Sequence, residues 1–351
     1  MKIFTKNSEI LKNAGNNILE KFQIRLSRKK AFKYTKEIRE FKGKTYVDSG
    51  VLNEIKKYAK NELGSSSYWP WLVLYSEIRE RFIPGWIPQD YYRFVLLKKY
   101  NTELAIRISE SKTMDYQFFP EFAFKPLFYQ IYGNLYSPEG ELLSNLEVND
   151  LLKKYNAELV IKESYGWQGK QVTFLHSNEF GLDNLKKNKS YTIQPVIKQH
   201  EELEKIHPSS VNTIRVNTYL DEKGAPVLLN ALLRFGIDGS RVDNSSNGGS
   251  ICFIGEDGKC EKWSYDYYSS KSGTHHPNTN VEFSKIKIPN YALLLRKCLN
   301  SHKKFPYARI IGWDIAINLD GEPVLLEWNT NVPSLWKSEA IKGPLWEKIP
   351  R

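Results

Sequence analysis

The stretch GWDIAINLDGEPVLLEWNTN, residues 312–331, has the pattern of two half-apolar strands joined by a tight turn. Asp320-Gly321 predicts the turn, because glycine tolerates the positive φ that hairpin turns require. Pairing the strands outward from this turn places Leu319 opposite Glu322, Ile317 opposite Val324 and Asp314 opposite Glu327. The hairpin therefore predicts two carboxylates at directly opposed positions.

Two opposed carboxylates need a compensating charge, because like charges directly across a strand ladder destabilise a sheet. At a separation of about 4–5 Å they repel by roughly 1 kcal/mol in water and by roughly 3–4 kcal/mol where the effective dielectric constant is near 20. A hard cation such as Mg²⁺ would offset this repulsion and take its remaining ligands from water and phosphates. Asn329 shares a strand face with Glu327, because side chains alternate with period two. The alternative is an edge hairpin whose charges point to water.

The composition is that of a folded protein. The chain has 351 residues, of which 41% are hydrophobic and 13% aromatic, enough for a sizeable core and two lobes or domains. It contains no CxxC pattern, no apolar run of about 18 residues and no secretory signal at its charged start. These features predict a cytoplasmic protein.

The positive charge points to anionic partners. There are 51 Lys and Arg against 40 Asp and Glu, a net charge of +11, and part of this excess lies in residues 21–44. Nucleotide phosphates, phospholipid headgroups, an acidic glycan or nucleic acid would all suit it. A solvated lysine-rich surface would explain it equally well. Nucleic acid is not expected, because no recognition helix, RNP-type motif or zinc-finger spacing is present.

The chain divides into two regions, with residues 1–105 mostly helical and residues 106–351 of the α+β class. SEILKNAGNNILEKF (8–22) carries an apolar helical face, and WPWLVLYSEIRERF (69–82) predicts a second helix. Predicted strands then alternate with turns, and one further helix precedes the terminal hairpin. The strands are residues 158–164, 192–197, 212–220 and 226–236 with further strand sequence in 250–263, and the helix is 291–302.

A phosphate-binding segment is predicted where Lys162 ends an apolar strand and the loop ESYGWQGKQV follows. Gly166 and Gly169 would allow backbone N–H groups to approach an anion, and Lys162 and Lys170 would supply positive charge. The spacing is not that of a GxxxxGK[ST] loop, so a hairpin turn with an exposed lysine remains an alternative.

An adenosine-binding segment is predicted next along the chain. Gln194, Val196 and Ile197 belong to a short apolar strand whose backbone groups could bind an adenine edge. Glu201 or Glu202 could then hold the ribose hydroxyls. A strand that leads into a charged helix start would give the same sequence.

Two arginines lie within apolar strand sequence, Arg215 in NTIRV and Arg234 in LLRFG. A buried guanidinium requires an anionic partner, which could be a substrate or a structural carboxylate. The loop VDNSSNGGS (242–250) could surround an oxyanion or form an ordinary turn. Three histidines lack metal-ligand spacing and are expected at the surface or in loops: His207, His275 and His276.

Taken in chain order, these segments resemble the ATP-grasp superfamily and, within it, the sugar-transfer-associated ATP-grasp family. The resemblance spans roughly residues 85–340, and PSSVNTIRV and GWD…LLEWN are its most specific parts. The segments that carry it are ISESK with Lys112, ELVIKES with Lys162, residues 193–216, residues 234–249, HPNT (276–279) and residues 312–329.

The resemblance implies an ATP-grasp fold, in which two α+β lobes clasp ATP, preceded by the helical region. Lys112 and Lys162 would hold the α- and β-phosphates, and the loop from Gly166 to Lys170 would close over them. Asp314, Glu327 and Asn329 would bind Mg²⁺, or Mn²⁺ in its place. The chain departs from the family at Pro195, where an acid is usual, so Glu201 or Glu202 is expected to substitute at the ribose.

The resemblance also implies an ATP-dependent carboxylate–amine ligase. A carboxylate attacks the γ-phosphoryl group, and an amine then displaces phosphate from the acyl phosphate to form an amide. Arg215, Arg234 and Asn247 in the Asn247-Gly248-Gly249 loop are the candidates for stabilising the transferring group.

The family's association with sugar transfer suggests an amine or amino acid joined to a uronic-acid-type sugar or acidic glycan in surface polysaccharide biosynthesis. A lipid-linked sugar at the inner membrane face would also suit the positive charge. The other classes are an ATP-dependent phosphotransferase on the same fold and a non-catalytic module that binds glycan or nucleic acid.

Overall fold

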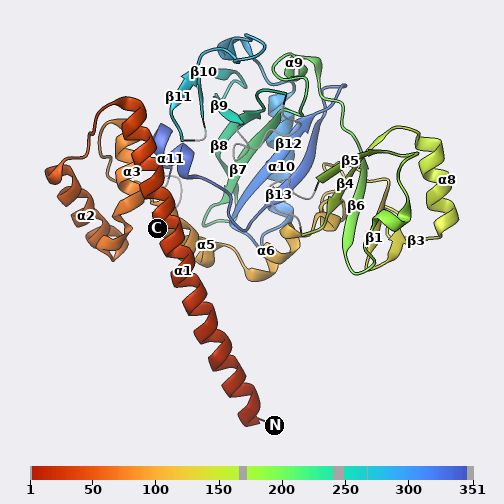
Figure 1. Cartoon of the computed structure of the whole chain (residues 1–351), viewed down its shortest axis with the longest axis horizontal. Helices are drawn as coiled ribbons and strands as arrows, with labels where there is room; N and C mark the ends of the chain where they lie inside the picture. The colour runs from red at the N-terminus through yellow and green to blue at the C-terminus, as the bar shows by residue number, and fades with distance from the viewer. Residues whose placement is uncertain (1, 166–171, 240–248, 267, 346–351) are drawn as a thin grey trace. The chain divides into compact units, whose positions relative to one another are not determined.

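The chain folds into two compact units (Figure 1). The computed structural model describes residues 2–165, 172–239, 249–266 and 268–345, with side chains of the first helix described from Ile18 onward. The first unit comprises residues 1–100, 268–270 and 334–351, and the second comprises residues 101–267 and 271–333. Within the described residues, no helix has the length and apolar character needed to cross a membrane.

The first unit is helical, which confirms the helical region predicted at the N-terminus. Its helices are α1 (Lys2–Lys42), α2 (Ser49–Leu63), α3 (Trp69–Arg79), α4 (Gln89–Tyr91), α5 (Leu97–Tyr100) and α11 (Trp336–Lys342), with a 3-10 turn at Ser66–Tyr68 and a π-helical turn at Tyr92–Leu96. Aromatic rings form its centre: Trp71 of α3 and Tyr34 of α1 both pack on Trp336 of α11, with ring centroids 5.5 Å and 5.8 Å apart. Arg39 of α1 donates two hydrogen bonds to the buried Glu77 of α3.

The second unit contains two antiparallel sheets. The first sheet has the strand order β3-β2-β1-β6-β4-β5. Its strands are β1 (Phe128–Ile131), β2 (Asn134–Tyr136), β3 (Leu142–Leu143), β4 (Glu158–Glu163), β5 (Val172–His176) and β6 (Ser190–Pro195). Helix α8 (Asn145–Tyr155) begins with a capping box between Ser144 and Glu147, and its Val148 and Leu152 join the core of this sheet.

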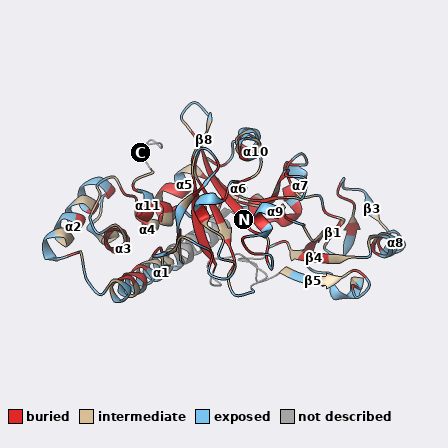
Figure 2. Ribbon diagram, turned by 90° about the horizontal axis from the view of Figure 1, so that it is seen from above, coloured by how far each residue is buried: buried red, intermediate tan, exposed pale blue. Residues whose placement is uncertain are grey.

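The second sheet has the strand order β11-β10-β9-β8-β7-β12-β13. Its strands are β7 (Thr213–Leu220), β8 (Pro226–Phe235), β9 (Ser250–Ile254), β10 (Cys260–Tyr265), β11 (Lys271–Gly273), β12 (Ile310–Ile317) and β13 (Pro323–Asn329). Leu294 and Cys298 of helix α10 (Tyr291–Lys304) join the main core against one face of this sheet, whose strands are largely buried (Figure 2). The remaining short elements of the second unit are α6 (Glu103–Glu110), η3 (Lys112–Met114), α7 (Asp115–Phe118), η4 (Leu182–Asn184), α9 (Glu201–Glu204) and η6 (Phe283–Lys285).

The β12–β13 hairpin confirms the opposed pair and corrects the predicted turn. Asp314 pairs with Glu327, as expected, but Ile317 pairs with Pro323 rather than Val324. The loop has three residues, Leu319–Gly321, rather than two, and the backbone N–H of Asn318 donates to Glu322 O. This shifts the pairs next to the turn by one residue, so the predicted pairing of Leu319 with Glu322 is wrong as well.

A β-bulge at Leu326 restores the register at the opposed pair. Leu325 and Trp328 both pack in the core, although they are three residues apart. The two residues between them, Leu326 and Glu327, are only partly buried and therefore both face away from the core. The bulge thus places an apolar side chain and a carboxylate side by side on one face of the strand.

Candidate active site

The candidate site lies on the face of the second sheet opposite its core. Ile214 and Val216 of β7, and Trp313 and Ile315 of β12, are fully buried in the main core. Because side chains alternate along a strand, Arg215 and Asp314 project from the other face. They occupy paired positions on adjacent strands, and Asp314 is in turn paired with Glu327 of β13.

Both arginines pair with Asp314. Arg215 forms a bidentate pair with it, Nε to Oδ1 and Nη2 to Oδ2, both at 2.5 Å, and Arg234 Nη1 lies 3.0 Å from Oδ1. Of the two anionic partners considered for the arginines, a substrate or a structural carboxylate, the structure therefore contains the carboxylate. The two guanidinium groups also supply positive charge that offsets the repulsion expected between the opposed carboxylates.

The two arginines keep Asp314 ionised. Burial by itself would raise the pKa of the Asp314 carboxyl, but the attraction and hydrogen bonds of Arg215 and Arg234 outweigh burial and lower the pKa below its ordinary value. The side chain of Arg215 is 8% exposed, so this bidentate pair is shielded from water. Two guanidinium groups therefore meet at one carboxylate on this part of the sheet.

Gly312 makes room for this ion pair. A Cβ at Gly312 would lie 3.0 Å from Asn217 Oδ1, 3.1 Å from Arg215 Nη1 and 3.3 Å from Pro333 Cβ. The missing side chain therefore lets the guanidinium of Arg215 lie over β12. This is the structural reason for glycine in the GWD segment.

A second charged cluster surrounds Lys162. Lys112 and Asp115 come from the adjoining elements η3 and α7, and both are buried. Burial lowers the pKa of Lys162, while the nearby carboxylates of Asp115 and Glu327 oppose that shift. Lys162 Nζ also donates to Leu326 O at the bulge, at 3.5 Å. The structure thus brings Lys112 and Lys162, the two lysines expected at the phosphates, into one cluster with Glu327.

Asp115 is a member of this cluster that the sequence analysis missed. Its Oδ1 accepts a hydrogen bond of 3.0 Å from the indole Nε1 of Trp328, the residue between Glu327 and Asn329. Burial raises the pKa of Asp115 well above its ordinary value, and the cation of Lys162 opposes this rise. The only sequence signal was its position three residues after Lys112, a spacing that places both on one short helical turn.

A largely apolar cavity of about 150 Å³ adjoins Lys162. Its lining residues are Phe124, Val160, Lys162, Val172, Phe174, Gln194, Pro195, Val196, Ile197, Val211, Thr213 and Leu326. All three residues predicted for the adenine edge are among them, and the Gln194 side chain donates to Phe124 O at 2.8 Å. An apolar slot with a lysine on its wall suits a flat base joined to phosphates.

The structure does not bring Glu201 or Glu202 to this cavity. Both are exposed at the start of α9, where Glu202 pairs with Lys205, and neither contributes to the cavity lining. Gly166, Gly169 and Lys170 of the predicted phosphate loop lie outside the described residues, as do Asn247 and Gly248.

The predicted metal ligands offer only oxygen atoms. Among the described residues, no group of three or more His, Cys, Asp and Glu side chains is placed to hold a metal. The predicted set instead combines the carboxylates of Asp314 and Glu327 with the amide oxygen of Asn329, which accepts a hydrogen bond from Val332 N at 3.1 Å. Carboxylate and amide oxygens have two lone pairs each, so Asp314 Oδ2 and Asn329 Oδ1 can each accept a further partner. This donor set fits a hard cation that is also bound by phosphates.

All three histidines lie outside the helices and strands named above, as expected, but two of them are buried. His207 is 2% exposed and lies 2.8 Å from Ser210 Oγ, and His276 is 1% exposed with Nε2 2.9 Å from Gly236 O. Their rings pack with centroids 5.7 Å apart. Burial lowers the pKa of both imidazoles. Both histidines therefore have structural partners within the second unit.

Comparison with solved structures finds distant similarity to several synthetases and ligases. D-cycloserine synthetase is 11% identical over 70% of this chain and 73% of that chain, with a TM-score of 0.38. The D-alanine–D-alanine ligase of Bacillus anthracis is 15% identical over 71% of this chain and 68% of that chain, with a TM-score of 0.41. N5-carboxyaminoimidazole synthase from Aspergillus clavatus is 10% identical over 72% of this chain, with a TM-score of 0.39, and the match covers 55% of that enzyme.

A match to a family model identifies the family of the chain. Comparison with curated proteins gives no match. The family model described as sugar-transfer associated ATP-grasp matches residues 98–344, which is more than two thirds of the chain. The match takes in the cavity, the lysine cluster and the Asp314–Glu327 hairpin. The chain therefore belongs to the sugar-transfer associated ATP-grasp family.

Proposed function

We propose that the chain is an ATP-dependent ligase that joins a carboxylate to an amine through an acyl phosphate. The observation that carries the proposal is the paired arrangement of Asp314 and Glu327, with Arg215 and Arg234 on the Asp314 carboxylate. Two acids for a cation and two guanidinium groups for a transferring phosphoryl group lie on one sheet face. Leu326, next to Glu327, links this face to the apolar cavity.

ATP would bind with its base in the cavity and its phosphates toward the arginines. Val196 and Ile197 would face the adenine, and Lys162, on the cavity wall, would contact the α- or β-phosphate. Lys112 would contribute a second positive charge from the same cluster. Gly166, Gly169 and Lys170 remain the proposed phosphate loop. Neither Glu201 nor Glu202 lines the cavity, so the ribose contact is not assigned to either.

Asp314, Glu327 and Asn329 would hold Mg²⁺ or Mn²⁺. The cation would neutralise charge on the β- and γ-phosphates and fix their orientation. Asp314 would then serve two roles, since the carboxylate that binds the cation also orients both arginines. An in-line attack of the substrate carboxylate on the γ-phosphorus would develop charge beside Arg215 and Arg234, with Asn247 as a further donor.

The arginines would act again in the second step. The amine attacks the acyl carbon, the bond to phosphate breaks, and inorganic phosphate leaves as the amide forms. Guanidinium groups positioned before the reaction stabilise the oxyanion and the leaving phosphate without reorganisation. The bidentate contact to Asp314 and the space over Gly312 provide that positioning.

For the substrates, we propose a uronic-acid-type sugar as the carboxylate and an amino acid or other amine as its partner. The family's association with sugar transfer supports the sugar, and the two guanidinium groups that meet at Asp314 support an acceptor with a carboxylate. The product would be an amidated sugar of a surface polysaccharide.

ADP release measured against a matrix of amines and acids tests this function. The expected result is Mg²⁺-dependent ADP release that requires both a uronic acid and an amine, with an amide product identified by mass spectrometry. ADP release with a sugar alone, together with a phosphorylated sugar, would replace the ligase with a phosphotransferase. ATP binding with no turnover in any combination of an adequate panel would contradict the enzymatic proposal.

A further inference from the structure

Helix α1 presents an apolar stripe to solvent. Ile18, Leu19, Phe22 and Leu26 are 71%, 56%, 56% and 48% exposed, and they recur at the three- and four-residue spacing of one helix face. Exposed large apolar residues are ordinary when scattered, but a contiguous stripe of four on one helix marks an interaction surface. We call these four residues the apolar stripe.

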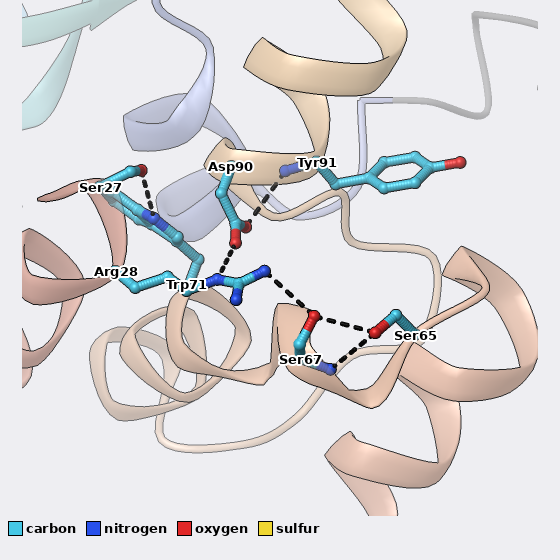
Figure 3. Close-up of polar contacts among 7 residues, drawn as sticks. All are labelled: Ser27, Arg28, Ser65, Ser67, Trp71, Asp90 and Tyr91. Atoms are coloured by element: carbon cyan, nitrogen blue, oxygen red, sulfur yellow. Dashed lines mark hydrogen bonds and ion pairs between the residues drawn. The ribbon is translucent and has the colours of Figure 1, made fainter. Parts of the chain in front are cut away.

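The opposite side of α1 is fixed to its own unit. Arg28 Nε donates to the buried Asp90 at 2.8 Å and Arg28 Nη2 donates to Ser67 at 3.1 Å, while the indole of Trp71 donates to Ser27 (Figure 3). Because these contacts hold α1 through its inner side, the helix cannot turn its apolar stripe inward without breaking them. The stripe is therefore a fixed feature of the folded unit.

Basic residues lie beside the apolar stripe and along the rest of α1. Lys21, Arg25 and Lys29 are exposed and lie beside its four apolar members. Over its whole length α1 carries twelve Lys and Arg against four Glu, a net charge of +8 out of +11 for the entire chain. A helix with an apolar face and basic flanks is the form that lies in the interface of an anionic bilayer.

We propose that α1 docks on an anionic phospholipid surface, with the apolar stripe entering the headgroup boundary and Lys21, Arg25 and Lys29 contacting lipid phosphates. Charge decides between this partner and a second copy of the chain. Two helices of net charge +8 would repel one another along a shared stripe, whereas an anionic surface attracts the same charges. The proposal is independent of the ligase function, since every residue it uses belongs to the first unit.

Sedimentation with lipid vesicles tests the docking. The full chain is mixed with vesicles of phosphatidylcholine alone and of phosphatidylcholine with an equal share of phosphatidylglycerol. Binding is expected only to the anionic vesicles, and it should weaken at least about tenfold when salt rises from about 0.1 M to about 1 M, because the Debye length falls from about 10 Å to about 3 Å.

Two sets of substitutions separate the apolar and the ionic contributions. Ile18→Ser, Phe22→Ser and Leu26→Ser together should weaken binding at both salt concentrations. Lys21→Glu, Arg25→Glu and Lys29→Glu together should abolish binding at low salt. The matched control, Lys153→Glu, Lys154→Glu and Lys187→Glu, changes three exposed lysines of the second unit by the same charge and should retain most of the binding. Circular dichroism checks that each variant keeps its helix content.

Three results would overturn the proposal. Equal binding to neutral and anionic vesicles would show that lipid charge does not contribute. Equal losses of binding for the control variant and for the variant at Lys21, Arg25 and Lys29 would show that only the net charge of the protein matters. A dimer in analytical ultracentrifugation that the serine substitutions convert to monomer, with no vesicle binding, would assign the stripe to a second copy. None of these results depends on turnover, so a failed ADP-release assay leaves the docking test intact.

Discussion

The two opposed acids of the hairpin, Asp314 and Glu327, have different surroundings, although the same role was predicted for both from the sequence. Asp314 is bonded to two arginines, whereas Glu327 is attracted by Lys162 and repelled by Asp115. Asp314 should therefore stabilise the fold, because it pairs with a guanidinium group that is shielded from water. Glu327 should contribute little to stability, because the attraction of Lys162 and the repulsion of Asp115 oppose each other.

This difference predicts unequal effects of two conservative substitutions. Asp314→Asn should lower the free energy of unfolding by about 3 kcal/mol, because it removes the charged carboxylate that forms the bidentate pair with the buried Arg215. Glu327→Gln should change stability by less than about 1 kcal/mol, since it loses one attraction and one repulsion of similar kind. Urea denaturation of both variants measures the difference, and ADP release should be lost in both. Equal stability losses would mean that the arginines do not depend on Asp314.

A buried histidine predicts the acid stability of the second unit. His302 of α10 is fully buried, with Nδ1 2.6 Å from Thr218 Oγ1 and Nε2 2.9 Å from Ala308 O, and burial lowers the pKa of its imidazole to about 4. The unfolded chain takes up this proton near pH 6.5, well before the folded protein does. Stability should therefore be complete above about pH 6.5 and should fall by about 3 kcal/mol as the pH approaches 4.

Denaturant midpoints between pH 7 and pH 4 test this dependence. His302→Gln should be less stable than the parent at pH 7 and should show a weaker pH dependence, because the titrating group is gone. His275→Gln, at an exposed ring, is the matched control and should retain the parent slope. An unchanged slope in His302→Gln would assign the acid sensitivity to another group.

At the scale of elements, the sequence predicted the second sheet better than the first. Strands β7, β8 and β12 are long and rich in apolar residues, so their positions were predicted to within a residue or two. Strands β2 and β3 have three and two residues, too few for periodicity to separate them from loops. The hairpin register was right at Asp314 and wrong at Ile317, because neither the three-residue loop nor the bulge that compensates for it has a distinct sequence pattern.

Two glycines of the hairpin should separate function from stability. Gly312→Ala places a Cβ against Arg215 Nη1, so it should lower kcat by about tenfold to a hundredfold through displacement of the guanidinium. Gly321→Ala puts a side chain at φ 78°, which should cost about 1 kcal/mol of stability while kcat is retained. Kinetics and thermal melting of both variants provide the comparison. A similar loss of kcat in both would show that the turn, rather than Arg215, governs turnover.

At the scale of the whole molecule, sequence periodicity predicted the classes of elements but could not predict which charged groups meet when they lie far apart in the sequence. The pairing of Arg215 with Asp314 joins residues 99 positions apart in the sequence, and it follows from the antiparallel register of β7 and β12. Asp115 was missed for the same reason, since its partner Trp328 is 213 residues away. Contacts of this separation depend on sheet order, which local patterns do not encode.

Nucleotide binding should stabilise the second unit as a whole, since the proposed site takes residues from both of its sheets. A nonhydrolysable ATP analogue with Mg²⁺ at about 100 times its Kd should add about 2.7 kcal/mol, which corresponds to a rise in Tm of about 5–10 °C. Lys162→Ala should weaken binding of the ATP analogue but not of adenosine, because the proposed partner of Lys162 is a phosphate. Equal losses for both ligands, measured by calorimetry, would place Lys162 outside the phosphate site.

The hydrogen bond between Trp328 and Asp115 gives the protein its own spectroscopic reporter. Each indole N–H yields one resonance in a heteronuclear NMR spectrum, and Trp328→Phe would assign the peak that belongs to this bond. Its chemical shift depends on the charge of the accepting carboxylate, which is sensitive to Lys162 and Lys112. Adding the nucleotide should move this peak and leave that of Trp71, whose indole donates to Ser27 in the other unit. In protein enriched in ¹⁵N, one proton therefore offers a way to observe the lysine cluster while nucleotide binds, without an attached dye or a reaction.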